Sequence, residues 1–345
     1  MSLERNCNTS LIPVIDFDAF FDKSTKHAVA GEMLQSFKDI GFVYLINHGI
    51  PQAKVTEMFE MSKKFFALPL ETKNLAPHPP SGTHHRGFSA QGQEKVTQHV
   101  YDCDSLAEQR AQAPDAKESF ECGREEDELM PNIWLPEGTL VGFKETCLEF
   151  FWVSFLACLV YHFIRVHQLC HKIELDILRA LALGFGLDEE YFTQCHTAPD
   201  NQLRLLHYPS VPLDALHQNS IARIGAHSDF GWITLLLQDD VGGLEIEDPN
   251  VPGAFRSVTP VSGALLVNAG DFMMRWSNDT IKSTIHRVCA PPGTTSGMTP
   301  ERYSIPYFCS ADFSTVVDCI PGTWDEGAGR PNFPSAASTS ELQQT

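Results

Sequence analysis

The chain has 345 residues, of which 43% are hydrophobic and 20% charged, a composition typical of a globular protein with a sizeable buried core. Its formal net charge is −19 at pH 7, so phosphate backbones and anionic lipid surfaces would be repelled. The composition therefore argues against a nucleic-acid-binding protein and against one that binds a membrane surface. It does not exclude a local basic pocket.

Ten cysteines are scattered along the chain without a Cys-x-x-Cys pair, and the first residues, MSLERNCNTSLIPVIDF, contain no apolar stretch followed by a cleavage site. Such a pattern is typical of proteins that keep free thiols in a reducing compartment. We therefore expect a cytoplasmic protein whose partner is a small molecule, with no nucleic-acid or membrane partner. The sequence leaves the oligomeric state open.

The N-terminal region, residues 1–136, begins with alternating strands and helices. Apolar residues at strand or helical spacing predict strands at 13–17 and 42–46 and helices at about 26–40 and 51–66. This alternation predicts an α/β region at the start of the chain.

The middle of the chain has two different characters. Residues 77–136 are rich in Pro, Gly, Gln and acidic residues, so we expect irregular lid and loop structure there. Residues 137–200 are predicted to be mainly helical, with a stretch at about 143–183 that lacks Gly and Pro and a short helix near 188–194. Residues 150–164 of the long stretch are apolar apart from one serine and one histidine. These 15 residues are fewer than the roughly 20 needed to span a bilayer, which favours a buried helix.

From residue 201 to about 320 the pattern changes to short apolar runs separated by turn residues. The runs are LRLLHYP, ARIGAHSD, WITLLLQD, GLEIED, GALLVNAGD, STIHRVCA and RYSIPYF. Many short strands with Gly and Pro turns between them predict a sandwich, a barrel or a jelly roll. Residues 321–345 are rich in Gly, Pro, Ser and Thr, and we expect a flexible tail.

One of these runs contains a His-x-Asp pair. Residues i and i+2 of a strand point to the same face, so His227 and Asp229 can face the interior of a barrel together. Two imidazoles and one carboxylate on one face of a metal are typical of mononuclear Fe(II) oxygenases. A histidine from a distant strand, such as His286 in STIHRV, would complete the set. In a chain with 14 histidines and 44 acidic residues such pairs also arise by chance, so the pair alone is a weak indication.

Further blocks of sequence make the indication specific. GAHSDFGWITLLLQDDVGGLEI is followed by LLVNAGDFMMRWSNDTIKSTIHRV and RYSIPYF, and the N-terminal half contains IPVIDF, GFVYLINHGIP and KKFFALP. In these blocks the chain resembles the isopenicillin N synthase-like family of 2-oxoglutarate/Fe(II) dioxygenases over most of its length. The resemblance implies an α+β fold, with a double-stranded β-helix (jelly-roll) core at 201–320 that is backed by helices and preceded by an α/β region.

The resemblance implies that Fe(II) is bound by His227, Asp229 and His286, with 2-oxoglutarate and O₂ as co-substrates. In this family 2-oxoglutarate is oxidatively decarboxylated to succinate and CO₂ while the substrate is oxidised. No side chain beyond the metal ligands is expected to react, since the protein supplies geometry, a dry pocket and complementary charge.

The resemblance also assigns Arg302, Ser304 and Tyr208 to the distal carboxylate of 2-oxoglutarate. A guanidinium and a hydroxyl suit a carboxylate, and a spacing of two residues aims Arg302 and Ser304 at the same point. Plant-type members often have Asn two residues before the tyrosine, whereas this chain has Leu206. We therefore expect fewer polar contacts to the co-substrate.

Several longer stretches resemble thymine dioxygenases, a group within this family. They include RGFSAQGQEKVTQ, APDAKESFECGRE, NQLRLLHYP and NAGDFMMRWSNDTIKST. By strand parity Arg204 and Phe308 point inward, and an arginine beside an aromatic ring suits a flat, carbonyl-bearing heterocycle. Asn201 would add an amide contact, and Phe230 would line the pocket. We therefore expect the substrate to be a small planar (hetero)aromatic metabolite, such as a pyrimidine or a secondary-metabolite intermediate.

Two alternatives remain open. One is an Fe(II) oxidase of the same fold that works without 2-oxoglutarate, because such relatives keep the Arg-x-Ser pair. The other is a catalytically inactive binding protein on this scaffold, against which the intact triad argues. In addition, about 14 residues near 153–166 have no counterpart in the family, and we interpret them as an insertion or a translated intron.

Overall fold

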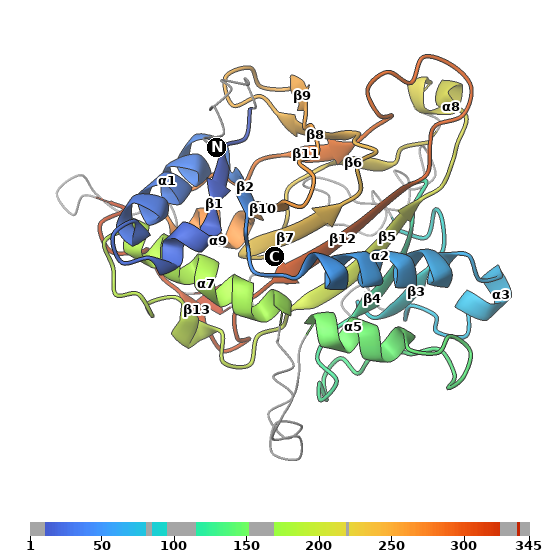
Figure 1. The fold of residues 1–345 in the computed structure, drawn as a ribbon, viewed down its shortest axis with the longest axis horizontal. Helices are drawn as coiled ribbons and strands as arrows, with labels where there is room; N and C mark the ends of the chain where they lie inside the picture. The colour runs from blue at the N-terminus through green and yellow to red at the C-terminus, as the bar shows by residue number, and fades with distance from the viewer. Residues whose placement is uncertain are drawn as a thin grey trace.

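Two β-sheets that face each other form the core of the protein (Figure 1). The computed structural model describes residues 11–80, 85–94, 115–151, 169–218, 221–324 and 337–338. The larger sheet has eight strands, which are in spatial order β1 (Val14–Asp16), β2 (Phe42–Ile46), β10 (Leu265–Ala269), β7 (Ile233–Gln238), β12 (Arg302–Cys309), β5 (Gln202–Tyr208), β4 (Glu118–Cys122) and β3 (Gly87–Ser89). All neighbours in this sheet are antiparallel except β1 and β2.

The smaller sheet has four antiparallel strands. They are, in spatial order, β6 (Ile224–His227), β11 (His286–Val288), β8 (Leu244–Glu247) and β9 (Phe255–Ser257). A separate two-stranded sheet joins β13 (Val316–Val317) to β14 (Ala337–Ser338). Two largely antiparallel sheets that face each other, with helices behind the larger one, agree with the expected double-stranded β-helix, so the expected fold class is confirmed.

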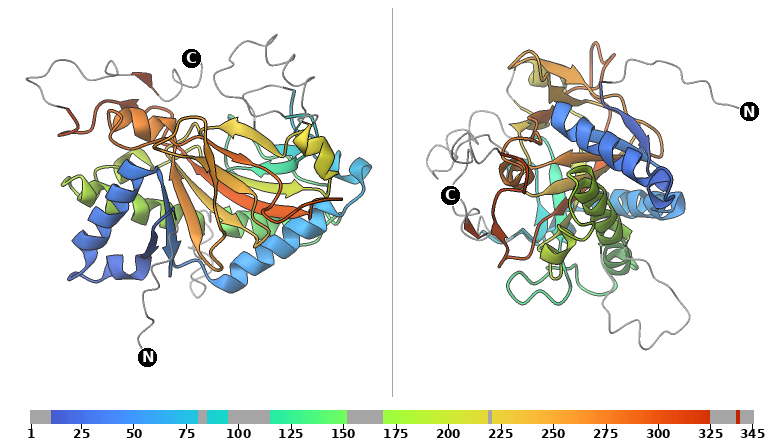
Figure 2. Two further views of the ribbon diagram at one scale, coloured as in Figure 1. Left: turned by 90° about the horizontal axis from the view of Figure 1, so that it is seen from above. Right: turned by 90° about the vertical axis from the view of Figure 1, so that its left-hand side faces the viewer.

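Four helices cover the face of the larger sheet that points away from the smaller one, as Figures 1 and 2 show. They are α1 (Lys26–Asp39), α2 (Gln52–Phe66), α5 (Phe143–Phe151) and α7 (Leu169–Gly184). Helix α1 packs on α7, whereas α2 and α7 both contact β12. The shorter helices are η1 (Phe17–Phe21), α3 (Leu70–Lys73), η2 (Thr193–Cys195), α8 (Leu213–His217) and α9 (Asp271–Trp276).

Side chains of the larger sheet alternate between an outer face toward the helices and an inner face toward the smaller sheet. On β5, Leu203 and Leu205 belong to the outer apolar cluster, whereas Leu206 and Tyr208 belong to the inner one. Burial of one such large apolar side chain contributes about 1.5–3 kcal/mol. This alternation fixes which face of the sheet each side chain points to. Polar residues of β5 that lie an even number of positions from Tyr208 therefore face the space between the sheets.

Most predicted elements are present, since each of the seven runs after residue 201 contains a strand. The expectation of irregular structure throughout 77–136 is wrong, because β3 and β4 extend the larger sheet. Strand β4 reads ESFEC, and its acidic residues obscured it in the sequence. Glu118 is paired with Lys73 at 2.6 Å and with Nδ1 of His207 at 2.7 Å, and neither partner is close to it in the sequence.

Residues 143–183 were predicted to form one long helix. Helix α5 lies at the beginning of this region and helix α7 at its end. The suspected insertion at 153–166 lies outside the described residues. The short helix expected near 188–194 is the single 3-10 turn η2. Among the residues that the structure describes, no helix is both long and apolar enough to cross a membrane.

A buried polar network ties α7 to the larger sheet. Glu174 of α7 is fully buried and accepts hydrogen bonds from Nδ1 of His171 at 2.9 Å and from the amide of Asn201 at 2.5 Å. Nδ1 of His196 lies 2.8 Å from the other carboxylate oxygen. Burial alone would raise the pKa of Glu174, but His171 and His196 hold it below its usual value. The carboxylate therefore stays ionised in the core.

Asn201 is a central member of this network. Its amide nitrogen also donates to the hydroxyl of Tyr307 at 2.9 Å, and its amide oxygen accepts from the backbone N–H of Ser310 at 2.8 Å. Both ends of the amide are thus used on the outer face of the sheet. These contacts link α7 to β12, and the expected contact of Asn201 with a substrate stays a prediction.

We expect Glu174→Gln to lower the free energy of unfolding by about 3 kcal/mol, because the buried partners would lose the charge that they bind. Since the pKa of Glu174 is lowered in the folded protein, this contribution is present above its ordinary value of 4.5 and is lost as the pH falls and the carboxylate is protonated. Urea unfolding at neutral and acidic pH measures the difference. The exposed substitution Glu137→Gln is the control, and it should change the stability by less than about 0.5 kcal/mol. Equal effects of the two substitutions would contradict the role of the network.

Candidate metal centre

Three potential metal ligands converge where β6 meets β11. His227 ends β6 and lies directly opposite His286, the first residue of β11, with the ring centroids 4.3 Å apart. Oδ1 of Asp229 lies 3.9 Å from Nε2 of His227 and 3.7 Å from Nε2 of His286. The three ligand atoms all lie within 4.8 Å of one another. The structure therefore brings together the three residues that the sequence singled out.

Backbone carbonyls fix the orientation of both imidazoles. Nδ1 of His227 lies 2.8 Å from the carbonyl oxygen of Gly225, and Nδ1 of His286 lies 3.1 Å from that of Thr284. A carbonyl can only accept, so each Nδ1 carries the hydrogen and each Nε2 carries a lone pair. A histidine that binds a metal through one ring nitrogen usually donates the N–H of the other to a carbonyl or a carboxylate in this way.

Asp229 is oriented in the same way. Its Oδ2 accepts hydrogen bonds from Thr234 at 2.6 Å and from the amide of Asn268 at 2.7 Å, which leaves Oδ1 for a metal. Burial would raise the pKa of Asp229, but the two histidines and these hydrogen bonds hold it below its usual value. Burial, and then the nearby His286, lowers the pKa of His227 to about 4. One carboxylate and two nitrogen lone pairs fit the ligand preference of Fe(II).

The backbone beside Asp229 is held by the start of α9. The N–H of Asp271 donates to the carbonyl of Asp229 at 2.8 Å. A Cβ atom on Gly270 would lie 2.8 Å from the same carbonyl and 2.2 Å from that of Gly231, so only glycine permits this approach. The close contact fixes the position from which the carboxylate reaches the two histidines.

A buried basic pocket lies on the inner face of β12. Arg302 is 1% exposed and donates to the hydroxyl of Ser304 at 3.1 Å and to the amide oxygen of Gln238 at 3.0 Å. Its guanidinium lies 4.8 Å from the ring centroid of Tyr208. The Nε atom has no hydrogen-bond partner among the described residues. Arg302, Ser304 and Tyr208 thus come together as expected.

A second arginine, which the sequence analysis missed, belongs to the same pocket. Arg223 is fully buried and donates to Thr299 at 2.9 Å and to the carbonyl of Pro300, while its Nε and Nη1 atoms lack partners in the described part of the chain. Burial, and then the charge of Arg302, lowers the pKa of Arg223 to about 10. Arg223 directly precedes β6, and a β-bulge between Ile224 and His227 interrupts the alternation there, so strand parity could not have assigned it.

Neither Arg302 nor Arg223 has a carboxylate within 4.0 Å among the residues described. Asp239 interacts with both arginines only beyond ion-pair distance, so the two buried guanidinium groups would be stabilised by an anion that contacts them directly. The donor set therefore fits a carboxylate ligand.

Arg204 and Phe308 form another wall of the space between the sheets. The guanidinium of Arg204 lies 5.3 Å from the centroid of the Phe308 ring. Burial alone would lower the pKa of Arg204, but the nearby carboxylates of Glu121, Glu94 and Asp229 raise it. The Asp229 carboxylate is therefore close enough to Arg204 to interact with its charge. This wall lies on the inner face, as strand parity predicted.

Phe230 lies next to the metal-ligand candidates but is half exposed. Its side chain is 45% exposed and packs edge-on against Phe272, with the centroids 5.4 Å apart. Leu206, at the position where plant-type relatives often have asparagine, is buried in the inner apolar cluster.

Charged residues from the segment predicted to be irregular complete the wall near Arg204. Lys117 forms an ion pair with Glu94, and Ser119 donates to Glu94 at 3.2 Å. Glu121 lies opposite Arg204 in the sheet, and its Oε1 lies 2.8 Å from Nε of Arg204. These residues could have been found in the sequence from their spacing, because residues 117, 119 and 121 alternate and therefore share one face of the strand.

We expect a small dicarboxylate to raise the melting temperature of the metal-free protein, because it would neutralise the two buried arginines. Arg223→Met should weaken the apparent affinity for 2-oxoglutarate about tenfold or more, corresponding to about 1.4 kcal/mol. Thermal unfolding across a concentration series of 2-oxoglutarate and of succinate measures the effect. Arg256→Met, at a position that is 54% exposed, is the matched control. A variant with the wild-type dependence would exclude Arg223 from the anion pocket.

Two protein families match the sequence. The N-terminal domain described as "non-haem dioxygenase in morphine synthesis" matches residues 12–137, and the "2OG-Fe(II) oxygenase superfamily" matches residues 199–311. Together these matches cover more than half of the chain, including the core that contains the metal-ligand candidates.

Individual proteins are similar over most of their length. The proline hydroxylase buaE of Petromyces alliaceus is 38% identical over 297 residues, 85% of each chain. The 2-oxoglutarate-Fe(II) type oxidoreductase ppzD of Metarhizium rileyi is 35% identical and covers 96% of this chain and 89% of its own. The crystal structure of full-length thymine 7-hydroxylase from Neurospora crassa, in complex with α-KG and thymine, has 40% identity and a TM-score of 0.83, covering 98% of this chain and 97% of that one. The chain therefore belongs to the 2OG-Fe(II) oxygenase superfamily and is a dioxygenase that depends on Fe(II) and 2-oxoglutarate.

Proposed function

We propose that His227, Asp229 and His286 bind Fe(II) and that the enzyme hydroxylates or otherwise oxidises a small planar aromatic or heteroaromatic metabolite. The observation that carries the proposal is the convergence of two Nε2 lone pairs and one carboxylate oxygen, each fixed by a hydrogen bond at its far side. Three protein ligands leave positions open for the co-substrates. When bound, Fe(II) and 2-oxoglutarate supply the activation of O₂, with release of succinate and CO₂.

Arg302, Ser304 and Tyr208 bind the distal carboxylate of 2-oxoglutarate in this proposal, and Arg223 adds a second positive charge. The support is the pair of buried guanidinium groups, each with free N–H groups among the described residues. Ser304 already orients Arg302, so the guanidinium is preorganised and loses little entropy when a carboxylate binds.

The substrate lies against Arg204, Phe308 and Phe230 in this proposal. Phe308 offers a face for stacking, and Arg204 donates to a ring carbonyl. Because Glu121 compensates the charge of Arg204, the wall suits a neutral ring better than an anion. Crystal structures of the Neurospora crassa hydroxylase with thymine and with 5-formyluracil support a pyrimidine or a related ring from secondary metabolism.

We further propose a cytoplasmic enzyme. In support, the described cysteines are free thiols, as expected in a reducing compartment: Cys122, Cys147, Cys170, Cys195, Cys289, Cys309 and Cys319. The proposed division of the chain is an N-terminal dioxygenase region with lid loops (1–136), a helical segment (137–200), the core (201–320) and a tail (321–345). The two family matches correspond closely to the first and third of these regions.

We expect His286→Ala to weaken Fe(II) binding at least about tenfold, because only two protein ligands remain. Anaerobic titration with Fe(II) and 2-oxoglutarate, followed through the weak visible charge-transfer band of the chelate, measures the affinity. His217→Ala, at an exposed position of α8, should titrate like the wild type. An unchanged band in His286→Ala would exclude His286 as an iron ligand.

A substrate screen tests the planar-ring proposal. Succinate formation is measured with pyrimidines, nicotinate-like rings, aromatic polyketides and, because one relative is named a proline hydroxylase, proline. For a ring that is turned over, Arg204→Met should lower kcat/KM about 10- to 100-fold without changing the Fe(II)–2-oxoglutarate band, whereas Arg256→Met should change neither. No turnover of any planar ring would exclude the proposed substrate class. Oxygen consumption that does not require 2-oxoglutarate would favour the alternative of an Fe(II) oxidase.

A further inference from the structure

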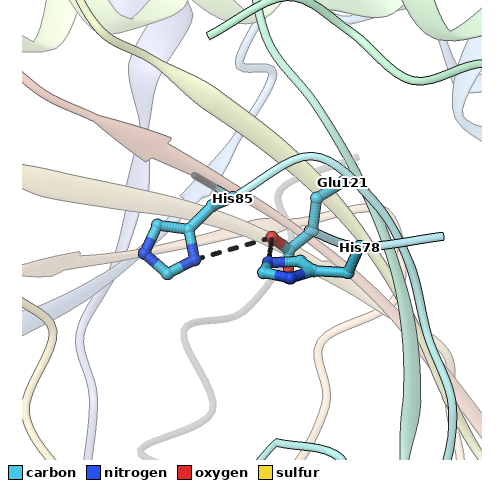
Figure 3. Close-up of side chains that lie close together, drawn as sticks. All are labelled: His78, His85 and Glu121. Carbon is cyan, nitrogen blue, oxygen red and sulfur yellow. Dashed lines mark ion pairs between the residues drawn. The ribbon is translucent and has the colours of Figure 1, made fainter. Parts of the chain in front are cut away.

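Two histidines and one glutamate also meet at a second place, beside the substrate wall (Figure 3). Glu121 belongs to β4, whereas His78 and His85 lie in the segment that precedes β3. Nε2 of His78 and Nδ1 of His85 each lie 3.8 Å from Oε2 of Glu121. The three ligand atoms lie within 4.8 Å of one another.

The ring of His78 presents a lone pair to this group. Its Nδ1 lies 2.7 Å from the carbonyl oxygen of Pro79, so Nδ1 carries the hydrogen and Nε2 is an acceptor. Nε2 is buried and has no hydrogen-bond partner among the described residues. It faces Oε2 of Glu121, which is also an acceptor. Two acceptors in this arrangement repel each other unless a cation or a proton lies between them.

Glu121 has one carboxylate oxygen, Oε2, that faces the two histidines. It is fully buried, Nε of Arg204 lies 2.8 Å from Oε1, and the amide of Gln202 donates to Oε2 at 2.8 Å. One lone pair of Oε2 therefore remains toward the histidines. The carboxylate would be stabilised by a further positive charge.

His85 approaches from the solvent side. Its side chain is 48% exposed, so an ion at this position would keep access to water.

The distances in this group match those of the iron-ligand candidates, where the nitrogens lie 3.7 and 3.9 Å from the carboxylate oxygen. We propose that His78, His85 and Glu121 form a second metal site, which binds a divalent transition metal of the Zn²⁺ type. Two imidazoles and one carboxylate leave a fourth tetrahedral position for water, and nitrogen ligands disfavour Ca²⁺ and Mg²⁺. Because Glu121 also holds Arg204, the bound ion would fix one wall of the substrate space.

The test uses Co²⁺ as a visible probe for a Zn²⁺ site in the metal-free, full-length protein. Equilibrium dialysis and absorption should give two equivalents of Co²⁺ for the wild type and one each for His286→Ala, His78→Ala and His85→Ala. Added Zn²⁺ should remove the remaining Co²⁺ absorption of His286→Ala. His27→Ala, at an exposed position of α1, is the control and should keep two equivalents.

Either of two results would overturn the proposal. One is a single equivalent of Co²⁺ in the wild type, and the other is a second equivalent that survives both His78→Ala and His85→Ala. The Fe(II)–2-oxoglutarate band should persist in the two variants, which shows that they are folded and that the loss is confined to the second site. Glu121→Gln is less suitable on its own, since it also removes the partner of Arg204.

Discussion

The antiparallel contact between β6 and β11 is the interaction on which the metal centre depends. In this register His227 and His286 are direct neighbours, and a shift of one residue would turn one imidazole to the opposite face of the sheet. On its other side β11 is held by β8, where His286 pairs with Ile246. A strand of only three residues is thus fixed from both edges before any ion binds. The hydrogen bonds from Nδ1 of His227 and of His286 to backbone carbonyl groups then fix the tautomer of each ring.

The protein is acidic overall, yet three arginines line the space between its sheets. They differ in whether a carboxylate contacts the guanidinium group. The charge of Arg204 is compensated by Glu121, so this wall is close to neutral and suits an uncharged ring. Arg302 and Arg223 lack such a partner among the described residues, which suits a dianion. The chain as a whole carries a net charge of −19, so the distribution of charge inside the fold, and not its sum, decides which ligand each wall accepts.

Period-two alternation explains both what could be predicted from the sequence and what could not. It places Arg302 and Ser304 on one inner face, and the structure agrees. It does not extend to Arg223, because a β-bulge in β6 interrupts the alternation between Ile224 and His227. Strand β4 could not be predicted, because its buried acids are acceptable only next to partners that are distant in the sequence. The pairing of Glu121 with two histidines was hidden for the same reason.

The chemistry of the proposed iron ligands has a consequence for how the enzyme acquires its ion. Two imidazole nitrogens and one carboxylate oxygen bind copper, nickel and zinc more strongly than ferrous iron in the general order of stability of divalent complexes. The donor atoms therefore do not discriminate in favour of iron. Which ion occupies the fold is decided by the relative supply of free metals when the chain matures, and a cell that fails to keep copper and zinc scarce would accumulate the protein in a mismetallated, inactive form.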